Sequence, residues 1–367
     1  MTDPRLKKLA DVLINYSVSV KPGDWVVVYY HPLAETFAGE VYRAVLEAGG
    51  HPTSVVDSEI LQEATYRYGS DDQLDWVSPL EKIVYHEVDV AIVLLASDNT
   101  RHLSNIDPKK QQKRAEAYSD LTQVMMKRSA SGDLRWTMTQ FPCPAYAQEA
   151  DMSLGDYQDF VHKATFTDQE DPVAAWKKVR TEQQKIVEWL KGKKGVSVIS
   201  PNADLNLSIE GRDFINADGT FNMPSGEVYT SPIEDSAQGW IEFTYPALNM
   251  GREVFGVRFE IKDGRVVKAT AEKNEDFLNA MLDTDDGART LGEFAVGTNY
   301  GIQKFTGSIL YDEKIGGSFH VAVGGGFPEV GGKNESAIHW DFICDIKKDS
   351  EIRVDGELLY KDGQFVI

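Results

Sequence analysis

Hydrophobic positions in the first half of the chain follow helical and strand periods in turn. Apolar residues spaced three and four apart, with capping residues at some of the ends, predict helices at 6–14, 34–47 and 107–128. Strand-length segments rich in apolar residues predict strands at 25–30, 53–57, 88–95 and 134–139. Because strands that are apolar on both faces occur where helices cover a sheet, this half is predicted to be an α/β domain with a mainly parallel sheet.

The second half has a different pattern, in which short strand-like segments recur with turns between them. After a helix that begins at Asp171 and Pro172, Asp-Gly pairs separate such segments at 263–264, 355–356 and 362–363. Asp-Gly is a strong signal for a tight β-hairpin turn, so this half is predicted to be antiparallel and β-rich, an α+β domain. The sequence LysGlyLysLysGly at 191–195 joins the two patterns, and we expect domains at 1–192 and 193–367.

Composition narrows the classes of partner and compartment. The 367 residues include 58 Asp and Glu against 38 Lys and Arg, a formal net charge of −20. Nucleic acid and anionic membrane are not expected as partners, because binding their phosphates needs a cationic surface. The sequence shows no bilayer-length apolar run and no secretory signal, so we expect a cytoplasmic protein. Cys143 and Cys344 lie far apart in apolar segments, which does not support a disulfide framework or a thiolate zinc site.

Two strand-like segments near the C-terminus place histidine and carboxylate opposite an apolar face. Alternation in 317–323 puts His320 on a face of small residues, opposite Phe319 and two valines. In 336–346, His339 and Asp341 share the face opposite Trp340 and its apolar neighbours. Imidazole nitrogen with carboxylate oxygen suits zinc, cobalt or manganese. The alternative is a structural hydrogen-bonded pair of His339 and Asp341 on a half-exposed strand.

Two glutamates in apolar or glycine-rich surroundings are further candidates. Glu227 follows a Pro/Gly turn in AsnMetProSerGlyGluValTyr at 222–229. Glu293 lies in LeuGlyGluPheAlaValGlyThrAsn at 291–299, a segment that is otherwise mostly apolar. A glutamate in such a place needs a cation, a proton or good hydrogen bonds.

Several ordered motifs resemble the M29 metallo-aminopeptidases, the group of aminopeptidase T, aminopeptidase S and PepS. In the second half these are MetProSerGlyGluVal, GluPheAlaValGlyThrAsn, AspGluLysIleGlyGly, His320 and SerAlaIleHisTrpAsp. In the first half they are ProAlaTyrAlaGlnGluAlaAspMetSer at 144–153 and AspTyrGlnAspPheVal at 156–161. The resemblance covers essentially the whole chain, and several motifs in order are far more specific than any one of them.

The resemblance implies a metal-dependent aminopeptidase that removes N-terminal residues from oligopeptides with a water activated at a two-metal centre. The implied cofactors are two divalent ions, zinc or cobalt first, with manganese or iron as alternatives. Their implied ligands are Glu227, Glu293, His320, His339 and Asp341. Five ligands suffice for two ions if a group bridges or if water completes the shells. The resemblance also implies a homodimer.

A general base must move a proton from the attacking water to the leaving amine. The candidate is Glu313, seven residues before His320. Its alternative role is a salt bridge with Lys314 or another lysine. Glu293 is a second candidate for the base, if it binds metal only loosely.

One position departs from the family pattern. Seven residues after His320, where the family usually has a tyrosine thought to assist at the transition state, this chain has Phe327. A phenyl ring donates no hydrogen bond to an oxyanion, and loss of one such donor costs about 10²- to 10³-fold in turnover. Tyr300 or Tyr311 could replace it. The alternative function is therefore a peptide- or metal-binding protein with weakened or lost catalysis.

Overall fold

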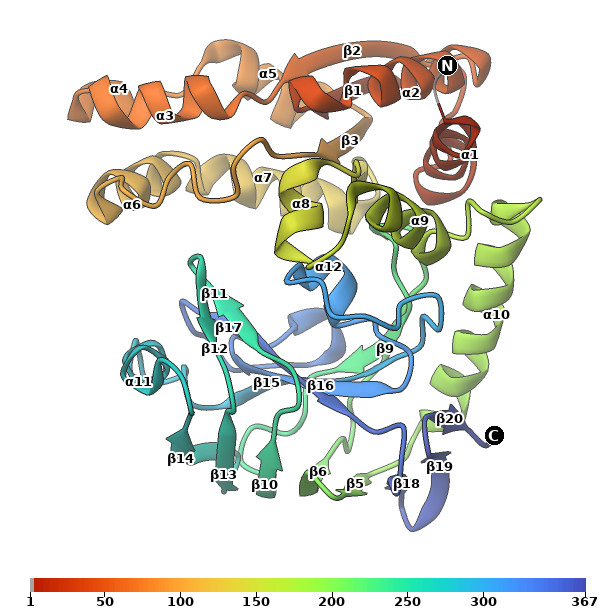
Figure 1. The fold of residues 1–367 in the computed structure, drawn as a ribbon, viewed down its shortest axis with the longest axis vertical. Helices are drawn as coiled ribbons and strands as arrows, with labels where there is room; N and C mark the ends of the chain where they lie inside the picture. The colour runs from red at the N-terminus through yellow and green to blue at the C-terminus, as the bar shows by residue number, and fades with distance from the viewer. Residues whose placement is uncertain (1–2) are drawn as a thin grey trace. The chain divides into compact units, whose positions relative to one another are not determined.

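The computed structural model describes residues 3–367, which pack as two compact units (Figure 1). Unit 1 contains the described residues up to Ala174 together with Gly219–Pro224, and unit 2 contains Ala175–Asp218 and Ser225–Ile367. Helix α10, Pro172–Leu190, therefore falls almost wholly in unit 2, whereas the domain boundary expected at 192/193 comes after this helix. A division into domains at that point stays a prediction.

Unit 1 is built on a five-stranded parallel sheet with the order β2-β1-β3-β4-β8. The strands are β1 (Trp25–Tyr30), β2 (His51–Val56), β3 (Val90–Leu95), β4 (Arg135–Gln140) and β8 (Asn222–Met223). Each of the first four overlaps a strand predicted from the hydrophobic pattern, and the predicted parallel sheet is confirmed. The fifth, β8, comes from the segment between two strands of unit 2 and was not predicted.

Nine α-helices within residues 3–164 accompany this sheet. They are α1 (Pro4–Val12), α2 (Glu35–Glu47), α3 (Glu59–Tyr68), α4 (Asp71–Asp75), α5 (Pro79–Glu87), α6 (Pro108–Ala117), α7 (Ser119–Ser131), α8 (Pro144–Glu149) and α9 (Leu154–Ala164). The one helix predicted at 107–128 is in fact two. At Tyr118 the backbone N–H bonds to the carbonyl of Ala115, and the helix restarts at Ser119.

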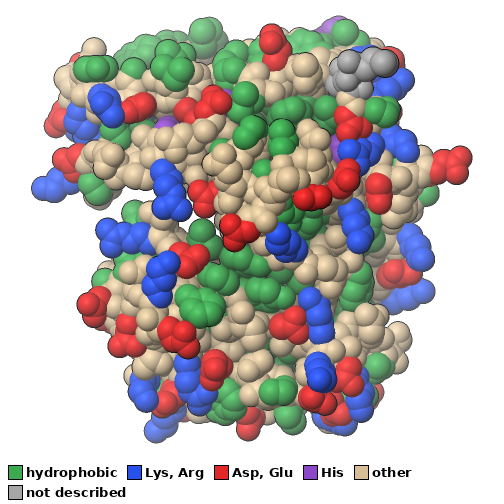
Figure 2. Space-filling view, in the orientation of Figure 1, with side chains coloured by type: hydrophobic (Ala, Val, Ile, Leu, Met, Phe, Trp, Pro, Cys, Tyr) green, Lys and Arg blue, Asp and Glu red, His purple; other side chains and the backbone are tan. Residues whose placement is uncertain are grey.

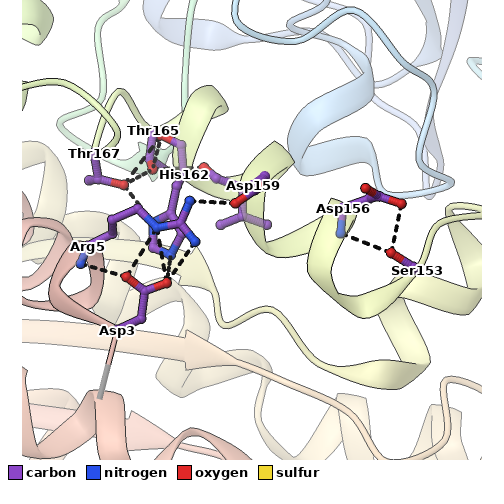
Figure 3. Close-up of polar contacts among 9 residues, drawn as sticks. Asp3, Arg5, Ser153, Asp156, Asp159, His162, Thr165 and Thr167 are labelled. Atoms are coloured by element: carbon purple, nitrogen blue, oxygen red, sulfur yellow. Dashed lines mark hydrogen bonds and ion pairs between the residues drawn. The ribbon is translucent and has the colours of Figure 1, made fainter. Parts of the chain in front are cut away.

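A polar cluster, buried around His162 and exposed at Asp159, connects the start of α1 to α9 (Figure 3). Asp3 caps α1 by accepting from the backbone N–H of Arg5, and the Arg5 guanidinium donates to Asp159 of α9 at 2.6 Å. His162 is buried, with Nδ1 2.7 Å from the Thr167 hydroxyl. Burial, reinforced by the Arg5 charge, lowers the pKa of His162 to about 4. This histidine is therefore neutral in the folded protein near neutral pH.

Unit 2 contains two antiparallel sheets. The larger has the order β14-β13-β10-β6-β5-β18-β19-β20. Its strands are β5 (Gly195–Ser200), β6 (Ala203–Ser208), β10 (Gln238–Glu242), β13 (Arg258–Lys262), β14 (Arg265–Thr270), β18 (Glu351–Val354), β19 (Glu357–Lys361) and β20 (Gln364–Phe365). The three Asp-Gly pairs join β13 to β14, β18 to β19 and β19 to β20. All six turn residues have positive φ, which aspartate tolerates and glycine favours, so the predicted hairpins are confirmed.

The smaller sheet of unit 2 has the order β17-β16-β15-β9-β7. Its strands are β7 (Ile215–Ala217), β9 (Glu227–Thr230), β15 (Leu291–Gly297), β16 (Ser318–Gly324) and β17 (His339–Asp345). The hydrophobic core of the unit contains side chains of both sheets, for example Leu205 of β6 and Phe319 of β16. The remaining elements are β11 (Ala247–Asn249), β12 (Arg252–Val254), α11 (Glu275–Leu282) and α12 (Ile309–Asp312).

Across residues 3–367, none of the helices has the length and the apolar character needed to cross a membrane.

Neutral His162 makes the stability of the fold depend on pH. Because its folded pKa, about 4, lies below its ordinary value of 6.5, the unfolded chain binds the proton more readily between these values. This contribution to stability is complete above pH 6.5 and is lost as the pH falls toward 4, up to roughly 3 kcal/mol. We expect the urea midpoint of His162→Gln to fall less than that of wild type between pH 7 and pH 4.5.

The matched control is His51→Gln, at an exposed position on the edge strand β2. It should follow the wild-type curve. Parallel curves for wild type and His162→Gln would show that the histidine does not titrate as described.

Candidate metal centre

The smaller sheet of unit 2 has two faces of opposite character. On one face, Phe294, Val321 and Phe342 belong to the hydrophobic core. The opposite face carries polar or small side chains, because successive residues of a strand point to opposite sides. The sequence prediction that Phe319 and Trp340 lie opposite His320 and His339 is thus consistent with the core, where both aromatic residues are buried.

Strand register brings the predicted metal ligands together on the polar face. Glu293 on β15 pairs with Ala322 on β16, which in turn pairs with Asp341 on β17. His320 pairs with Ala295, and His339 pairs with Gly324. Alanine and glycine between the polar positions leave room above the sheet. We call the residues that gather here the five-residue cluster: Glu227, Glu293, His320, His339 and Asp341.

The five side chains form a row in which each histidine lies between two carboxylates. His320 Nε2 lies 3.6 Å from Glu227 Oε2 and 3.7 Å from Glu293 Oε1. His339 Nε2 lies 3.1 Å from Glu293 Oε2 and 3.6 Å from Asp341 Oδ1. The two oxygens of Glu293 therefore face different histidines. About a third of the His339 side chain, 33%, is exposed, so this end of the row is open to solvent.

Several buried atoms of the cluster have no hydrogen-bond partner among residues 3–367. They are Glu227 Oε2, Asp341 Oδ1 and both ring nitrogens of His320. Buried polar atoms are nearly always paired, so each such atom calls for an explanation, of which an ion is one. By contrast, His339 Nδ1 lies 2.8 Å from the carbonyl of Gly325. A histidine that donates Nδ1–H to a carbonyl leaves Nε2 available as a metal ligand. The donor set fits a divalent metal.

Charge in the metal-free cluster is balanced by protons on the histidines. Burial would lower the pKa of His320, but the carboxylates of Glu293 and Glu227 raise it to about 9. Burial likewise opposes the charged form of His339, but Asp341 and Glu293 raise its pKa to about 11. Burial would raise the pKa of Glu293, and the two imidazoles instead lower it to about 2. The cluster thus attracts positive charge at its centre, the property that a cation site requires.

Comparison with known proteins identifies the family of this chain. A family model described as thermophilic metalloprotease (M29) matches residues 2–365. This chain belongs to the M29 metalloprotease family. It is 24% identical to aminopeptidase 2 of Geobacillus stearothermophilus over 99% of this chain and 95% of that protein. It is 26% identical to aminopeptidase T of Thermus thermophilus over 98% of this chain and 95% of that protein.

A solved structure has the same fold. Wild-type AmpT from Thermus thermophilus matches with a TM-score of 0.85 over 99% of both chains, at 22% sequence identity. The predicted architecture, an α/β part with a mainly parallel sheet and a β-rich part, is confirmed by this match and by the sheets described above. The predicted resemblance to M29 is likewise confirmed, and nothing in these comparisons favours a protein without catalysis.

Glu313, the predicted base, lies beside the five-residue cluster of this M29 chain. One of its oxygens lies within 4.8 Å of ligand atoms of Glu227 and His320. It also forms an ion pair with Lys314, so the salt bridge that the sequence left as its alternative role is present. Burial raises the pKa of Glu313 to about 8 in spite of that lysine. Glu313 therefore forms the salt bridge with Lys314 and also lies beside the cluster.

Lys314 is a residue of the site that sequence reasoning did not assign. Its side chain is fully buried, and Nζ lies 3.5 Å from Glu227 Oε1 in addition to its contact with Glu313. Burial would lower the pKa of Lys314, but these two carboxylates raise it, so the lysine is charged. The backbone is held as well, since the Lys314 carbonyl accepts from the N–H of Asn299. The signal in the sequence was a lysine directly after the candidate base.

Phe327 lies at the edge of the cluster. Its ring centroid is 5.0 Å from that of His339 and 5.0 Å from that of Tyr229. Its backbone N–H donates to the Ser231 hydroxyl at 2.8 Å, and a Cβ on Gly332 would come within 2.6 Å of that hydroxyl oxygen. The glycines here allow the loop to approach β9 closely. Position 327 is thus next to the candidate ligands, and it carries no hydroxyl.

A second group of metal-ligating residue types, in unit 1, does not fit a metal. His31, Glu59 and Asp98 have ligand atoms within 4.8 Å of one another. However, His31 Nδ1 accepts a hydrogen bond from the backbone N–H of Leu33. In a neutral imidazole the proton is then on Nε2, the nitrogen that faces Asp98. Glu59 meanwhile accepts from Ser97 and two backbone N–H groups. These residues are satisfied as a polar network.

We expect Lys314→Met to destabilise the metal-free protein. Without the lysine, the buried carboxylates of Glu227 and Glu313 have no fixed cation, and breaking such a buried pair costs about 3–5 kcal/mol. Zinc should stabilise the variant more than it stabilises wild type, because a bound cation replaces part of the missing charge. Thermal unfolding with chelator and with zinc measures both effects.

Lys348→Met, at an exposed position, is the matched control. It should unfold at the same temperature as wild type under both conditions. If Lys314→Met also unfolds at the wild-type temperature in chelator, the lysine does not stabilise the cluster electrostatically.

Proposed function

We propose that this M29 enzyme removes N-terminal residues from peptides with two divalent metal ions held by the five-residue cluster. The observation that supports this most strongly is the row of ligand atoms. Carboxylate oxygens and imidazole nitrogens face one another in it at 3.1–3.7 Å, and Glu227 Oε2, His320 Nε2 and Asp341 Oδ1 have no hydrogen-bond partner among residues 3–367. The Glu, His and Asp donors suit zinc or cobalt, with manganese or iron as alternatives.

We propose that Glu293 would help to hold both ions. Its Oε1 faces His320 and its Oε2 faces His339, so one carboxylate can serve both ions. Glu227 and His320 would hold one ion together with it, and His339 and Asp341 would hold the other. Three protein ligands with an open position is the arrangement typical of catalytic metal sites. When bound, such ions polarise a carbonyl and lower the pKa of a coordinated water.

Glu313 is proposed as the general base. It lies beside Glu227 and His320, where it can take a proton from the attacking water and pass it to the leaving amine. Its pKa, raised to about 8 by burial, lies near the pH at which such an exchange is most efficient. Glu293 is the weaker candidate, because its pKa is lowered to about 2 and both its oxygens face histidines. Lys314 holds the Glu313 carboxylate in place.

The free α-amine of the substrate is proposed to bind at this site as a further ligand of an ion. The exposed His339 marks the side from which a peptide end can enter. Because the two ions would balance the carboxylates, the amine would bind in its neutral form through its lone pair, which would explain a restriction to N-terminal residues.

We further propose a homodimer, as the resemblance implies. Unit 1 exposes large apolar side chains on α3 and α5, and green side chains gather over these helices in Figure 2. Ile60 and Leu61 are 77% and 65% exposed, and Leu80 is 74% exposed. Exposed apolar surface of this kind is typical of an interface. A monomer mass in sedimentation equilibrium would contradict it.

A cytoplasmic location is also proposed, supported by two free, buried cysteines, Cys143 and Cys344. Fractionation away from cytosolic markers would contradict it.

We expect exhaustive chelation to abolish hydrolysis of an aminoacyl-p-nitroanilide, and zinc or cobalt to restore it. The reason is that neither the carbonyl nor the water is activated without the ions. Metal content, measured alongside activity, should rise to two ions per chain as turnover returns. Full turnover by protein shown to be metal-free would contradict the proposal.

The matched control for N-terminal specificity is the same substrate with its α-amine acetylated. The restored enzyme should not cleave it, because the nitrogen of an acetylated amine has no free lone pair to donate to an ion. Equal cleavage of both substrates would indicate a general amidase.

A further inference from the structure

Tyr229 stands beside the proposed metal ligands without a role in the site so far. It follows Glu227 by two residues on β9, so both side chains lie on the same face of the sheet. Its ring packs against that of Phe327, with centroids 5.0 Å apart and planes inclined by 55°. Phe327 in turn packs against His339. Tyr229 therefore lines the same side of the sheet as the five-residue cluster.

Strand register places Tyr229 in line with His320. Tyr229 pairs with Ala295 on β15, and Ala295 pairs with His320 on β16. Neighbouring strands lie about 4.8 Å apart, so two strand spacings separate the tyrosine from the histidine. The residue between them contributes only a methyl group above the sheet. A tyrosine side chain is long enough to extend into the space over that alanine.

The Tyr229 hydroxyl is available for a ligand. It makes no hydrogen bond to any of residues 3–367, and its side chain is only partly buried. The other tyrosines considered for this role are less suited. The Tyr300 hydroxyl donates to the carbonyl of Gly363 at 2.9 Å, and Tyr311 is fully buried on α12.

We propose that Tyr229 is a catalytic residue whose phenol donates a hydrogen bond to the oxyanion that develops on the scissile carbonyl. Attack of water converts the carbonyl into a tetrahedral centre with negative charge on oxygen, and a fixed donor stabilises that charge. The adjacent Phe327 ring holds the phenol in place but donates nothing. This inference rests on the proposed two-metal site, which would bind the substrate next to Tyr229.

Tyr229→Phe is the decisive variant, because it removes only the hydroxyl and keeps the ring that packs on Phe327. We expect kcat to fall about 10²- to 10³-fold, the usual loss for one oxyanion donor. KM and metal content should change little. Binding of the phosphonic acid analogue of leucine, whose oxygens resemble the tetrahedral species, should weaken by a similar factor. Binding of 3-methylbutylamine, which has no such oxygens, should not.

Tyr300→Phe is the matched control and should keep wild-type turnover and phosphonate affinity. Wild-type kcat and phosphonate affinity in Tyr229→Phe would overturn the proposal. So would a fall in kcat accompanied by loss of metal, which would make the tyrosine a structural support of Glu227. A wild-type protein without metal-dependent activity would instead contradict the proposed function, and the two failures are thereby distinguished.

Discussion

Four carboxylates gather in one buried cluster of unit 2, and their mutual repulsion is the constraint on which the site depends. Glu227, Glu293, Glu313 and Asp341 each have at most 16% of the side chain exposed. A buried charge is costly unless it is paired. Lys314 supplies one fixed positive charge, and the raised pKa values of His320 and His339 show that the rest is met by protons when no metal is bound. Two divalent cations together carry four positive charges, which would balance the four carboxylates.

The strands that carry these charged side chains also contribute to the hydrophobic core, so the stability of the core and the geometry of the site depend on the same strands. Period-two alternation sends Phe319 and Val321 into the apolar interior while His320 between them points to the cluster. Small residues on the polar face make room for the neighbouring segment. A Cβ on Gly297 would lie 2.2 Å from the carbonyl oxygen of Ile315, so only glycine allows the Lys314 segment to lie against β15. The site is therefore fixed by rigid strands.

Much of this arrangement could be predicted from local sequence. Apolar runs located β1, β3 and β4, and the Asp-Gly pairs located three hairpins. Alternation alone put His320, His339 and Asp341 on polar faces. The break in the helix at Tyr118 was missed, because it depends on backbone hydrogen bonding that residue spacing does not encode. Strand β8 was missed because two residues carry no periodic pattern.

Relations across distant strands could not be predicted in the same way. Glu293 facing two histidines, and Lys314 reaching Glu227 as well as Glu313, depend on register and on side-chain direction. Tyr229 was overlooked because nothing local distinguishes it from any strand tyrosine. Its position in line with His320 becomes evident only when β9, β15 and β16 are aligned.

The most direct test of the two-metal centre is anomalous scattering from crystals grown with saturating zinc, measured on either side of the zinc absorption edge. We expect two zinc peaks within the five-residue cluster. One should lie among Glu227, His320 and Glu293, and the other among Glu293, His339 and Asp341. One peak or none within the five-residue cluster would contradict it.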